Sequence, residues 1–219
     1  MTIARSSSEA SAANAPANPG AGPHAAVTER VWLIRHGETE WSLSGRHTSR
    51  TDLPLTANGE RRAVEVGRLL ANRRFSLVLT SPRRRAMETC RLAGFGDVAQ
   101  IDANLLEWDY GEYEGRTSGE IQSERPGWSL WRDGVAGGES LAQVAARARA
   151  VIDRVLGSPG DALLFAHGHI LRVLLSSWLG LPPEMGCLFA LGTAAITTLG
   201  YEHTQPALVR FNDGVSQDH

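Results

Sequence analysis

The chain has 219 residues, a formal net charge of −2 and 22 basic side chains, every one of which is arginine. The absence of lysine excludes Schiff-base chemistry on a side-chain amine and the phosphate-binding lysines of P-loop and kinase-type sites, so arginine, histidine and backbone N–H groups must hold any bound anion. The near-neutral charge argues against a nucleic-acid binder, and no apolar run approaches the ~18 residues that a membrane span needs.

Residues 1–28 are rich in Ala, Ser, Pro, Asn and Gly, and they carry too little apolar surface to offset the entropy of ordering. We therefore predict a disordered tail over 1–28, one folded domain over 29–214 and a short tail over 215–219. The N-terminus lacks the apolar core of an export signal, and Cys90 and Cys187 lie far apart. These features predict a cytoplasmic protein with two buried free thiols.

The first half of the folded domain alternates buried strands with helices. Apolar runs predict strands over 31–34 and 77–80, and helical spacing predicts a helix over 58–72. Ser81 and Pro82 have the character of an N-cap and a first helical residue, so we expect the next helix to start there and to end at Leu92.

The second half continues the alternation. Ser140 and Gln143 form a capping box that opens a helix, and Gly157 ends it. A strand over 162–166, a helix reaching Trp178 and closing strands over 194–201 and 207–211 follow. This order predicts an α/β fold, a three-layer sandwich with a mostly parallel central sheet flanked by helices.

Polar residues follow three of the predicted strands directly. The first strand leads into Arg35-His36-Gly37, the second into Ser81 through Arg85, and a later one into His167-Gly168-His169. Parallel neighbours place these turns at one edge of the sheet, where such folds bind ligands. Arginine, histidine and a helix N-terminus gathered at that edge favour a phosphate group.

Each of these signals has an alternative interpretation. Arg35 could pair with a carboxylate, His36 could be a structural histidine, and the arginines of 83–85 could form a solvated helix face. His167 and His169 could be a metal pair, but no nearby Cys, His or acid completes the spacing of a ligand set, so we predict no metal.

A longer set of motifs strengthens the phosphate interpretation. The segment 35–41, Arg-His-Gly-Glu-Thr-Glu-Trp, resembles the signature of the histidine phosphatase superfamily, which has the phosphoglycerate mutase-like fold. Segments that resemble the remaining family motifs follow in the family's order at 52–60, 81–86, 106–115, 138–140 and 166–168. The segments 107–115, 131–134 and 166–169 are most similar to the sedoheptulose-bisphosphatase-like branch and to small bacterial acid phosphatases.

The resemblance implies a role for each matching residue. His36 would be the nucleophile that forms a phosphohistidine, and Glu107 would be the proton donor and later the base. Arg35, Arg85, His167 and Gly168 would surround the phosphoryl oxygens. The residues alone do not distinguish Glu107 from the neighbouring acids at 109, 112 and 114, and only the family pattern makes that choice. No metal or other cofactor is implied.

The implied function is a metal-independent phosphomonoester hydrolase for small phosphorylated metabolites, sugar phosphates or bisphosphates, without nucleic-acid or membrane partners. The oligomeric state is left open. A cofactor-dependent phosphoglycerate mutase is the alternative, although Ser42 replaces the Asn of such mutases and the short segment 108–139 should admit water. A third hypothesis is a binding module for phosphorylated ligands that does not turn them over.

Substrate recognition is predicted less sharply. The candidates are Ser42, Arg46, His47, Arg84 and His169. A second phosphate could be held by Arg46, His47, Arg50, Arg83 and Arg84, or these side chains could simply face solvent in an arginine-rich chain. Trp128 and Trp131 could flank a sugar or pack in the core. Ser49 replaces a Gly of the closest relatives, so the loop differs if that position needs a positive φ.

Overall fold

Six strands form one sheet in the computed structural model, which describes residues 29–214. They are β1 (Glu29–Arg35), β2 (Leu77–Thr80), β3 (Gln100–Ile101), β4 (Ala162–Ala166), β5 (Ile196–Glu202) and β6 (Gln205–Asp213). In the order β3-β2-β4-β1-β5-β6, the first four run parallel, and β5 and β6 pair antiparallel. The mostly parallel sheet is confirmed. The tails predicted at 1–28 and 215–219 lie outside the described residues.

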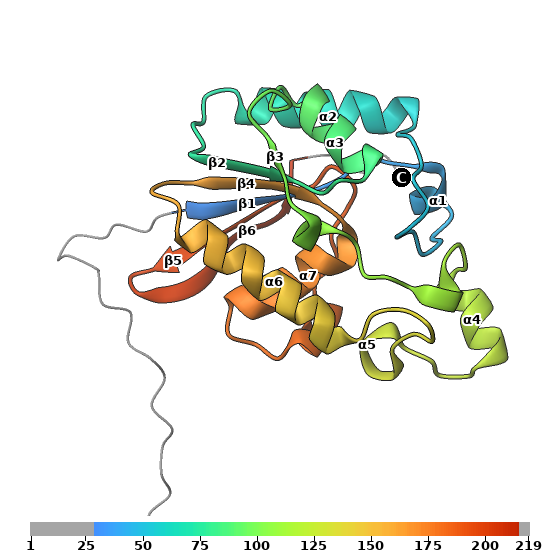
Figure 1. The fold of residues 1–219 in the computed structure, drawn as a ribbon. Coiled ribbons are helices and arrows are strands. Elements are labelled where there is room, and N and C mark those ends of the chain that lie inside the picture. The colour runs from blue at the N-terminus through green and yellow to red at the C-terminus, as the bar shows by residue number, and fades with distance from the viewer. Residues whose placement is uncertain (1–28, 215–219) are drawn as a thin grey trace, which may run out of the picture.

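Helices cover both faces of this sheet (Figure 1). On one face lie α2 (Ala57–Leu70) and α3 (Arg84–Leu92), and on the other lie α6 (Leu141–Leu156) and α7 (Gly168–Trp178). The short helices are α1 (Glu40–Leu43), α4 (Ser118–Glu124) and α5 (Leu130–Asp133), with 3-10 turns at Ala103–Leu105, Gly111–Tyr113 and Pro183–Leu188. The predicted three-layer sandwich is therefore confirmed.

Strand residues alternate between two apolar cores. Val31 and Leu33 pack in the core beneath α6 and α7, whereas Trp32 and Ile34 pack in the core beneath α2 and α3. All five residues of β4 are buried because helices cover both faces at the centre of the sheet. The continuous apolar runs in the sequence reflect this burial on both sides.

The prediction for the start of α3 is wrong. The helix begins at Arg84, and its N-cap position is Arg83, whose side chain makes no capping hydrogen bond. Ser81 lies two residues before the N-cap, where its hydroxyl is 2.7 Å from Nε2 of His167 and accepts the N–H of Arg83 at 3.4 Å. The capping box of Ser140 and Gln143 and the end of α6 before Gly157 are as predicted.

The prediction for the two cysteines is half correct. Both thiols are free within residues 29–214, but Cys90 is buried and Cys187 is exposed. Burial raises the pKa of the Cys90 thiol to about 12. In the described part of the chain, no helix combines the length and apolar character needed to cross a membrane.

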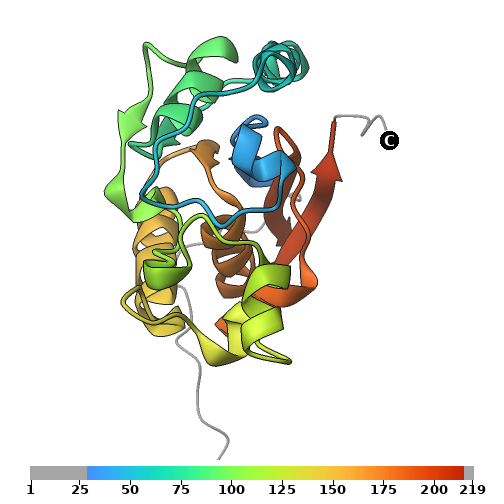
Figure 2. The same cartoon turned by 90° about the vertical axis from the view of Figure 1, so that its right-hand side faces the viewer.

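The carboxyl ends of β1, β2 and β4 meet at one edge of the sheet, which Figure 2 views from outside. The loop after α1 and the helix α4 border this edge. An isolated antiparallel bridge between Arg46 and Thr117 joins these two segments. Residues that are 71 positions apart in sequence thus form one rim of the edge.

Candidate active site

Backbone pairing brings the three predicted strand ends together. The N–H of His36 donates to Ala166 O at 2.9 Å, and the N–H of Ser81 donates to Phe165 O at 2.9 Å. The rings of His36 and His167 then lie edge to face with centroids 5.2 Å apart. The predicted convergence of these turns is present in the structure.

The His36 ring is held in one tautomer. Its Nδ1 lies 2.8 Å from the carbonyl oxygen of Gly37. Because a carbonyl can only accept, Nδ1 carries the proton and Nε2 keeps its lone pair. Burial, followed by the charges of Arg85 and Arg35, holds the pKa of His36 well below its usual value. The imidazole is therefore neutral at physiological pH, with the lone pair of Nε2 free of a proton.

Two arginines flank this ring, Arg85 buried and Arg35 partly buried. Arg85 is fully buried and donates through its two terminal nitrogens to Thr51 O at 3.1 Å and Thr48 O at 3.0 Å. Arg35 donates through Nη1 to Leu191 O at 2.6 Å. The Nε atoms of both arginines are buried and have no hydrogen-bond partner among the described residues. Burial lowers the pKa of both guanidinium groups, yet they remain cations. Unpaired cationic donors of this kind suit an oxyanion.

His167 adds another donor site to the cluster. Its Nε2 contacts the hydroxyl of Ser81, and its Nδ1 is buried without a partner in the part of the chain described. Burial, then the charges of Arg85 and His36, holds the pKa of His167 well below its usual value. The Ser81 hydroxyl fixes the orientation of this ring.

Glu107 lies at the N-terminus of α7. Its Oε1 accepts the N–H groups of Trp108 and Ile170 at 2.9 Å each, and its Oε2 accepts the N–H of His169 at 3.0 Å. Burial alone would raise the pKa of Glu107, but the hydrogen bonds and charge of His169, together with His167, hold that pKa well below its usual value. These hydrogen bonds and charges favour the ionised form of the carboxyl in the free protein.

Glycines allow these groups to approach closely. A Cβ atom on Gly168 would lie 3.6 Å from Arg35 Nε and 3.7 Å from Glu107 Oε2. A Cβ atom on Gly37 would lie only 2.7 Å from Gly59 O, in the first turn of α2. The glycine that follows His36 in the motif is therefore required for α2 to pack against the site.

A cavity of about 290 Å³ opens over His36 and Glu107, and we call it the active-site pocket. Four of the predicted substrate-binding residues line it: Ser42, Arg46, His47 and His169. Burial, then the charge of His169, lowers the pKa of His47 to about 4. The hydroxyl of Tyr110 lies 2.7 Å from Nδ1 of His169.

Other candidates lie away from this pocket. The Arg84 side chain is exposed, with Nε 3.5 Å from Glu88 Oε2, because successive helical residues point about 100° apart and Arg85 takes the inward face. The Nη2 of exposed Arg50 lies 2.5 Å from Asp109 Oδ2. Neither arginine lines the active-site pocket, and their contact with substrate stays a prediction.

The two tryptophans pack rather than flank the pocket. Trp128 is buried and donates through Nε1 to Gly134 O at 3.1 Å. Trp131 packs edge to face against Trp108 and beneath the guanidinium of Arg172.

Ser49 adopts no positive φ, and its hydroxyl donates to Glu107 O at 3.3 Å. The substitution of Gly by Ser is accommodated.

Sequence reasoning missed several partners in the site. The orientation of Ser81 toward His167 and the contact between Tyr110 and His169 follow from tertiary packing, although both residues lie within motifs. The carbonyls of Thr48, Thr51 and Leu191 hold the arginines through backbone atoms, which leave no sequence signal. Within residues 29–214, no group of three His, Cys, Asp or Glu side chains is placed to hold a metal ion.

Comparison with known proteins identifies the family to which this chain belongs. The family model of the histidine phosphatase superfamily, branch 1, matches residues 31–214. The chain is 42% identical to an acid phosphatase of Mycobacterium tuberculosis over 178 residues, covering 80% of this chain and 87% of that protein. It is 36% identical to the sedoheptulose 1,7-bisphosphatase of Saccharomyces cerevisiae over 194 residues, covering 74% and 71%. A solved structure of a Mycobacterium tuberculosis open reading frame superposes with a TM-score of 0.80 at 39% identity, covering 84% of this chain and 97% of that one.

Proposed function

The chain belongs to the histidine phosphatase superfamily, and we propose that it hydrolyses small phosphate monoesters through a phosphohistidine formed on His36. One observation carries the mechanism. The hydrogen bond from Nδ1 of His36 to Gly37 O leaves Nε2 unprotonated, between two arginines whose Nε atoms have no partner among the described residues.

The phosphoryl group of the substrate occupies the space between these cations. Arg35, Arg85 and His167 donate to its three non-bridging oxygens, and they stabilise the charge that spreads over those oxygens in the transition state. The Arg and His donors supply the stabilisation that a metal ion provides in other phosphatases, so the proposed reaction needs no metal.

In the first step, Nε2 of His36 attacks phosphorus and forms the N–P bond. The bond from phosphorus to the ester oxygen breaks, and its electron pair remains on that oxygen. Protonated Glu107 donates its proton to this oxygen, and the alcohol leaves.

In the second step, the Glu107 carboxylate removes a proton from water. The water oxygen attacks phosphorus, and the N–P bond breaks, which returns the electron pair to Nε2. Inorganic phosphate leaves and carries the proton of Glu107 with it, so the free protein again has an ionised Glu107 carboxyl. The two steps need no cofactor to account for their bonds, electron pairs and protons.

The source of the proton on Glu107 follows from the electrostatics. The free carboxyl is ionised because the hydrogen bonds and charge of His169, with the charge of His167, hold its pKa well below the usual value. Phosphate monoesters lose their last proton near pH 6, so below that pH a substrate enters as a monoanion. We propose that this monoanion transfers its proton to Glu107, whose pKa rises beside the bound phosphoryl group. The activity should therefore be greatest in mildly acidic solution.

The substrate class is proposed from the relatives and from the pocket. The two curated relatives compared above are an acid phosphatase and a sugar bisphosphatase. The polar side chains Ser42, Arg46, His47 and His169 line a pocket of about 290 Å³, which suits a phosphorylated sugar or sugar acid. We place this activity in the cytoplasm.

A panel of phosphate esters with and without EDTA tests the proposal. Wild-type protein should release phosphate from the esters at rates that EDTA does not change, and it should incorporate ³²P at His36. The His36→Ala variant should lose the label and on the order of 10³-fold or more in kcat. The His203→Asn variant, in an exposed turn outside the site, is the control. Activity equal to wild type in His36→Ala would overturn the mechanism.

The same assay separates hydrolysis from phosphoryl transfer. A phosphoglycerate mutase would convert 3-phosphoglycerate to 2-phosphoglycerate, and 2,3-bisphosphoglycerate would stimulate it. We expect the release of inorganic phosphate instead. A ligand-binding module would bind esters but would form no phosphohistidine.

A further inference from the structure

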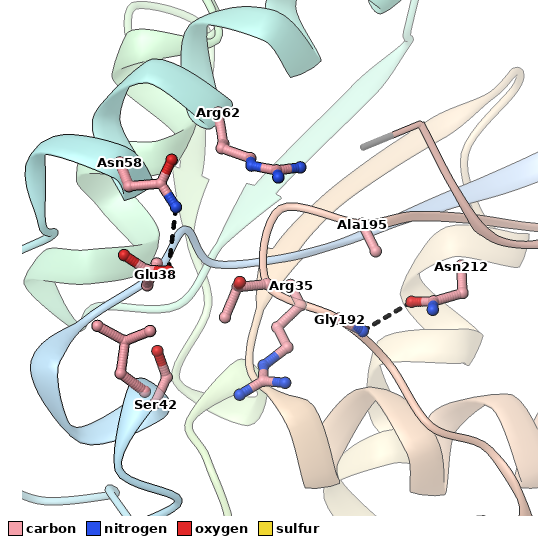
Figure 3. Close-up of a pocket in the computed structure, with 10 residues that line it drawn as sticks. Arg35, Glu38, Ser42, Asn58, Arg62, Gly192, Ala195 and Asn212 are labelled. Atoms are coloured by element: carbon pink, nitrogen blue, oxygen red, sulfur yellow. Dashed lines mark hydrogen bonds between the residues drawn. The ribbon is translucent and has the colours of Figure 1, made fainter. Parts of the chain in front are cut away.

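A second cavity adjoins the active-site pocket and shares Arg35 and Ser42 with it. Its volume is about 450 Å³, within the range of roughly 300–1,000 Å³ that is typical of small-molecule sites. Glu38, Asn58 and Arg62 lie on one side of it, and Gly192 and Asn212 lie on the other (Figure 3). Thr193 also lines it. We call this cavity the second pocket, and the proposed hydrolysis of monoesters makes no use of it.

Apart from Arg35, the charges of the second pocket balance. Arg62 projects from α2 toward the cavity, and Glu38 lies on the same side (Figure 3). The Glu38 carboxylate is fixed because it accepts from Thr56 Oγ1 at 2.6 Å and from Asn58 Nδ2 at 3.0 Å. Arg35 is the remaining cation, and its charge is matched by the phosphoryl group in the active-site pocket. A second anion would therefore face a fixed carboxylate with little compensating charge.

The polar groups of the second pocket include both donors and acceptors. Oδ1 of Asn212 accepts the N–H of Gly192 at 2.6 Å, so the Nδ2 group of that amide is left to donate elsewhere. The Thr193 hydroxyl can donate or accept, and the Glu38 carboxylate can accept further hydrogen bonds. Such a mixture matches vicinal hydroxyl groups, each of which both donates and accepts.

The wall between the two pockets is tied to the catalytic segment. The N–H of Ala194 lies 3.0 Å from Arg35 O and 3.2 Å from His36 O, and Leu191 O accepts from Arg35 Nη1. Ala194 has a positive φ of 56°, which is costly for a residue other than glycine. The packing thus holds the loop over 191–195 in a strained conformation that forms one side of the second pocket.

We propose that the second pocket binds a neutral, hydroxyl-rich group, such as a second sugar ring, of an extended phosphate ester whose phosphoryl group lies at His36. This inference rests on the proposed phosphatase function and names the class of substrate more narrowly. The preferred substrate is then a phosphorylated glycoside rather than a single phosphorylated sugar.

Two matched substrates test this inference. Glucose 6-phosphate and trehalose 6-phosphate carry the same 6-phosphoryl group and differ by one sugar ring. Wild-type protein should have at least a tenfold higher kcat/KM for the disaccharide. The Arg62→Met and Thr193→Val variants should remove most of that preference by raising KM for the disaccharide, while kcat/KM for glucose 6-phosphate stays within twofold. Arg68→Met, at an exposed position of α2 outside the pocket, is the matched control and should keep the preference.

Other outcomes overturn the inference. One is an equal kcat/KM for both substrates in the wild type, and another is an equal loss of kcat/KM for both substrates in the two pocket variants. A third is that the pocket variants lose kcat/KM for fructose 1,6-bisphosphate but not for fructose 6-phosphate, because the second pocket would then be an anion site. If the wild type hydrolyses no ester, the proposed function fails by itself. Isothermal titration calorimetry with trehalose 6-phosphate then measures whether the second pocket binds the disaccharide. Weaker binding to Arg62→Met than to Arg68→Met supports it, and equal or absent binding contradicts it.

Discussion

Oε1 of Glu107 accepts the backbone N–H of Ile170 at 2.9 Å, so the carboxylate in the active-site pocket also caps the N-terminus of α7. The neighbouring N–H of His169 donates to the other carboxylate oxygen at 3.0 Å. The helix dipole and these N–H groups favour the ionised form. The position of Glu107 and the start of α7 are therefore coupled, and a change at Glu107 should affect both activity and stability.

The Glu107→Gln variant should separate the role of the proton from the role of shape. Without a transferable proton, we expect kcat for an alkyl phosphate such as glycerol 3-phosphate to fall by about 10²–10⁴-fold. The loss should be much smaller for p-nitrophenyl phosphate, because its leaving group needs little protonation. Steady-state kinetics on both esters measure the difference. Equal losses on both would contradict the assignment of Glu107 as proton donor.

The Ser81→Ala variant should disturb the position of His167. Removing the hydroxyl leaves Nε2 of a fully buried imidazole without its 2.7 Å partner, at a cost of about 1–3 kcal/mol. We expect a fall in kcat and a changed ¹⁵N chemical shift of the His167 ring. The Ser123→Ala variant, at an exposed position of α4, is the control and should change neither kcat nor the His167 signal. An unchanged His167 signal in Ser81→Ala would refute the positioning role.

The thermal stability should depend on pH through the buried histidines. Burial lowers the pKa values of His36, His167 and His47, the last to about 4, whereas histidines in the unfolded chain titrate near pH 6.5. Below about pH 6.5 the unfolded chain therefore binds more protons than the folded one, and the free energy of unfolding falls as pH falls.

Calorimetry should therefore show a Tm that falls as the pH is lowered from 7.5 to 5. The His47→Gln variant removes one of these groups, so its Tm should depend less steeply on pH than that of the wild type. At lower pH, Glu107 adds to the loss in the same direction, because its depressed pKa stabilises the fold only while the carboxyl is ionised. A Tm that rises on acidification would contradict these assignments.

Two glycine substitutions test the packing of α2 against the site. In Gly59→Ala, the new Cβ would lie 2.3 Å from Glu38 O, a backbone atom that cannot move without shifting the motif. We expect a loss of about 1–3 kcal/mol in the free energy of unfolding and reduced activity. Gly157→Ala is the matched control, since its Cβ meets nothing closer than 3.5 Å. It should leave stability unchanged or raise it by about 0.4–1 kcal/mol. Denaturant unfolding measures both.

The sequence alone predicted the elements that define the fold. Continuous apolar runs at β1, β2 and β4 require burial on both faces, and the helical patterns between them require a parallel sheet. Polar residues directly after those runs then had to meet at one edge of the sheet. The sequence alone therefore predicted that His36, Ser81 and His167 lie close together, as they do in the structure. The order of the motifs predicted the family, which the comparison confirmed.

Only the tertiary structure decided which side chains enter the pockets and what holds them. Within one run of arginines, the family motif singled out Arg85, but only the geometry of α3 shows that Arg85 turns inward and Arg84 outward. The tautomer of His36 depends on the Gly37 carbonyl, and the arginines depend on carbonyls of distant loops. Backbone atoms are common to every residue, so their contacts leave no trace in the sequence. The second pocket arises in the same way, from segments 150 residues apart that only the folded chain brings together.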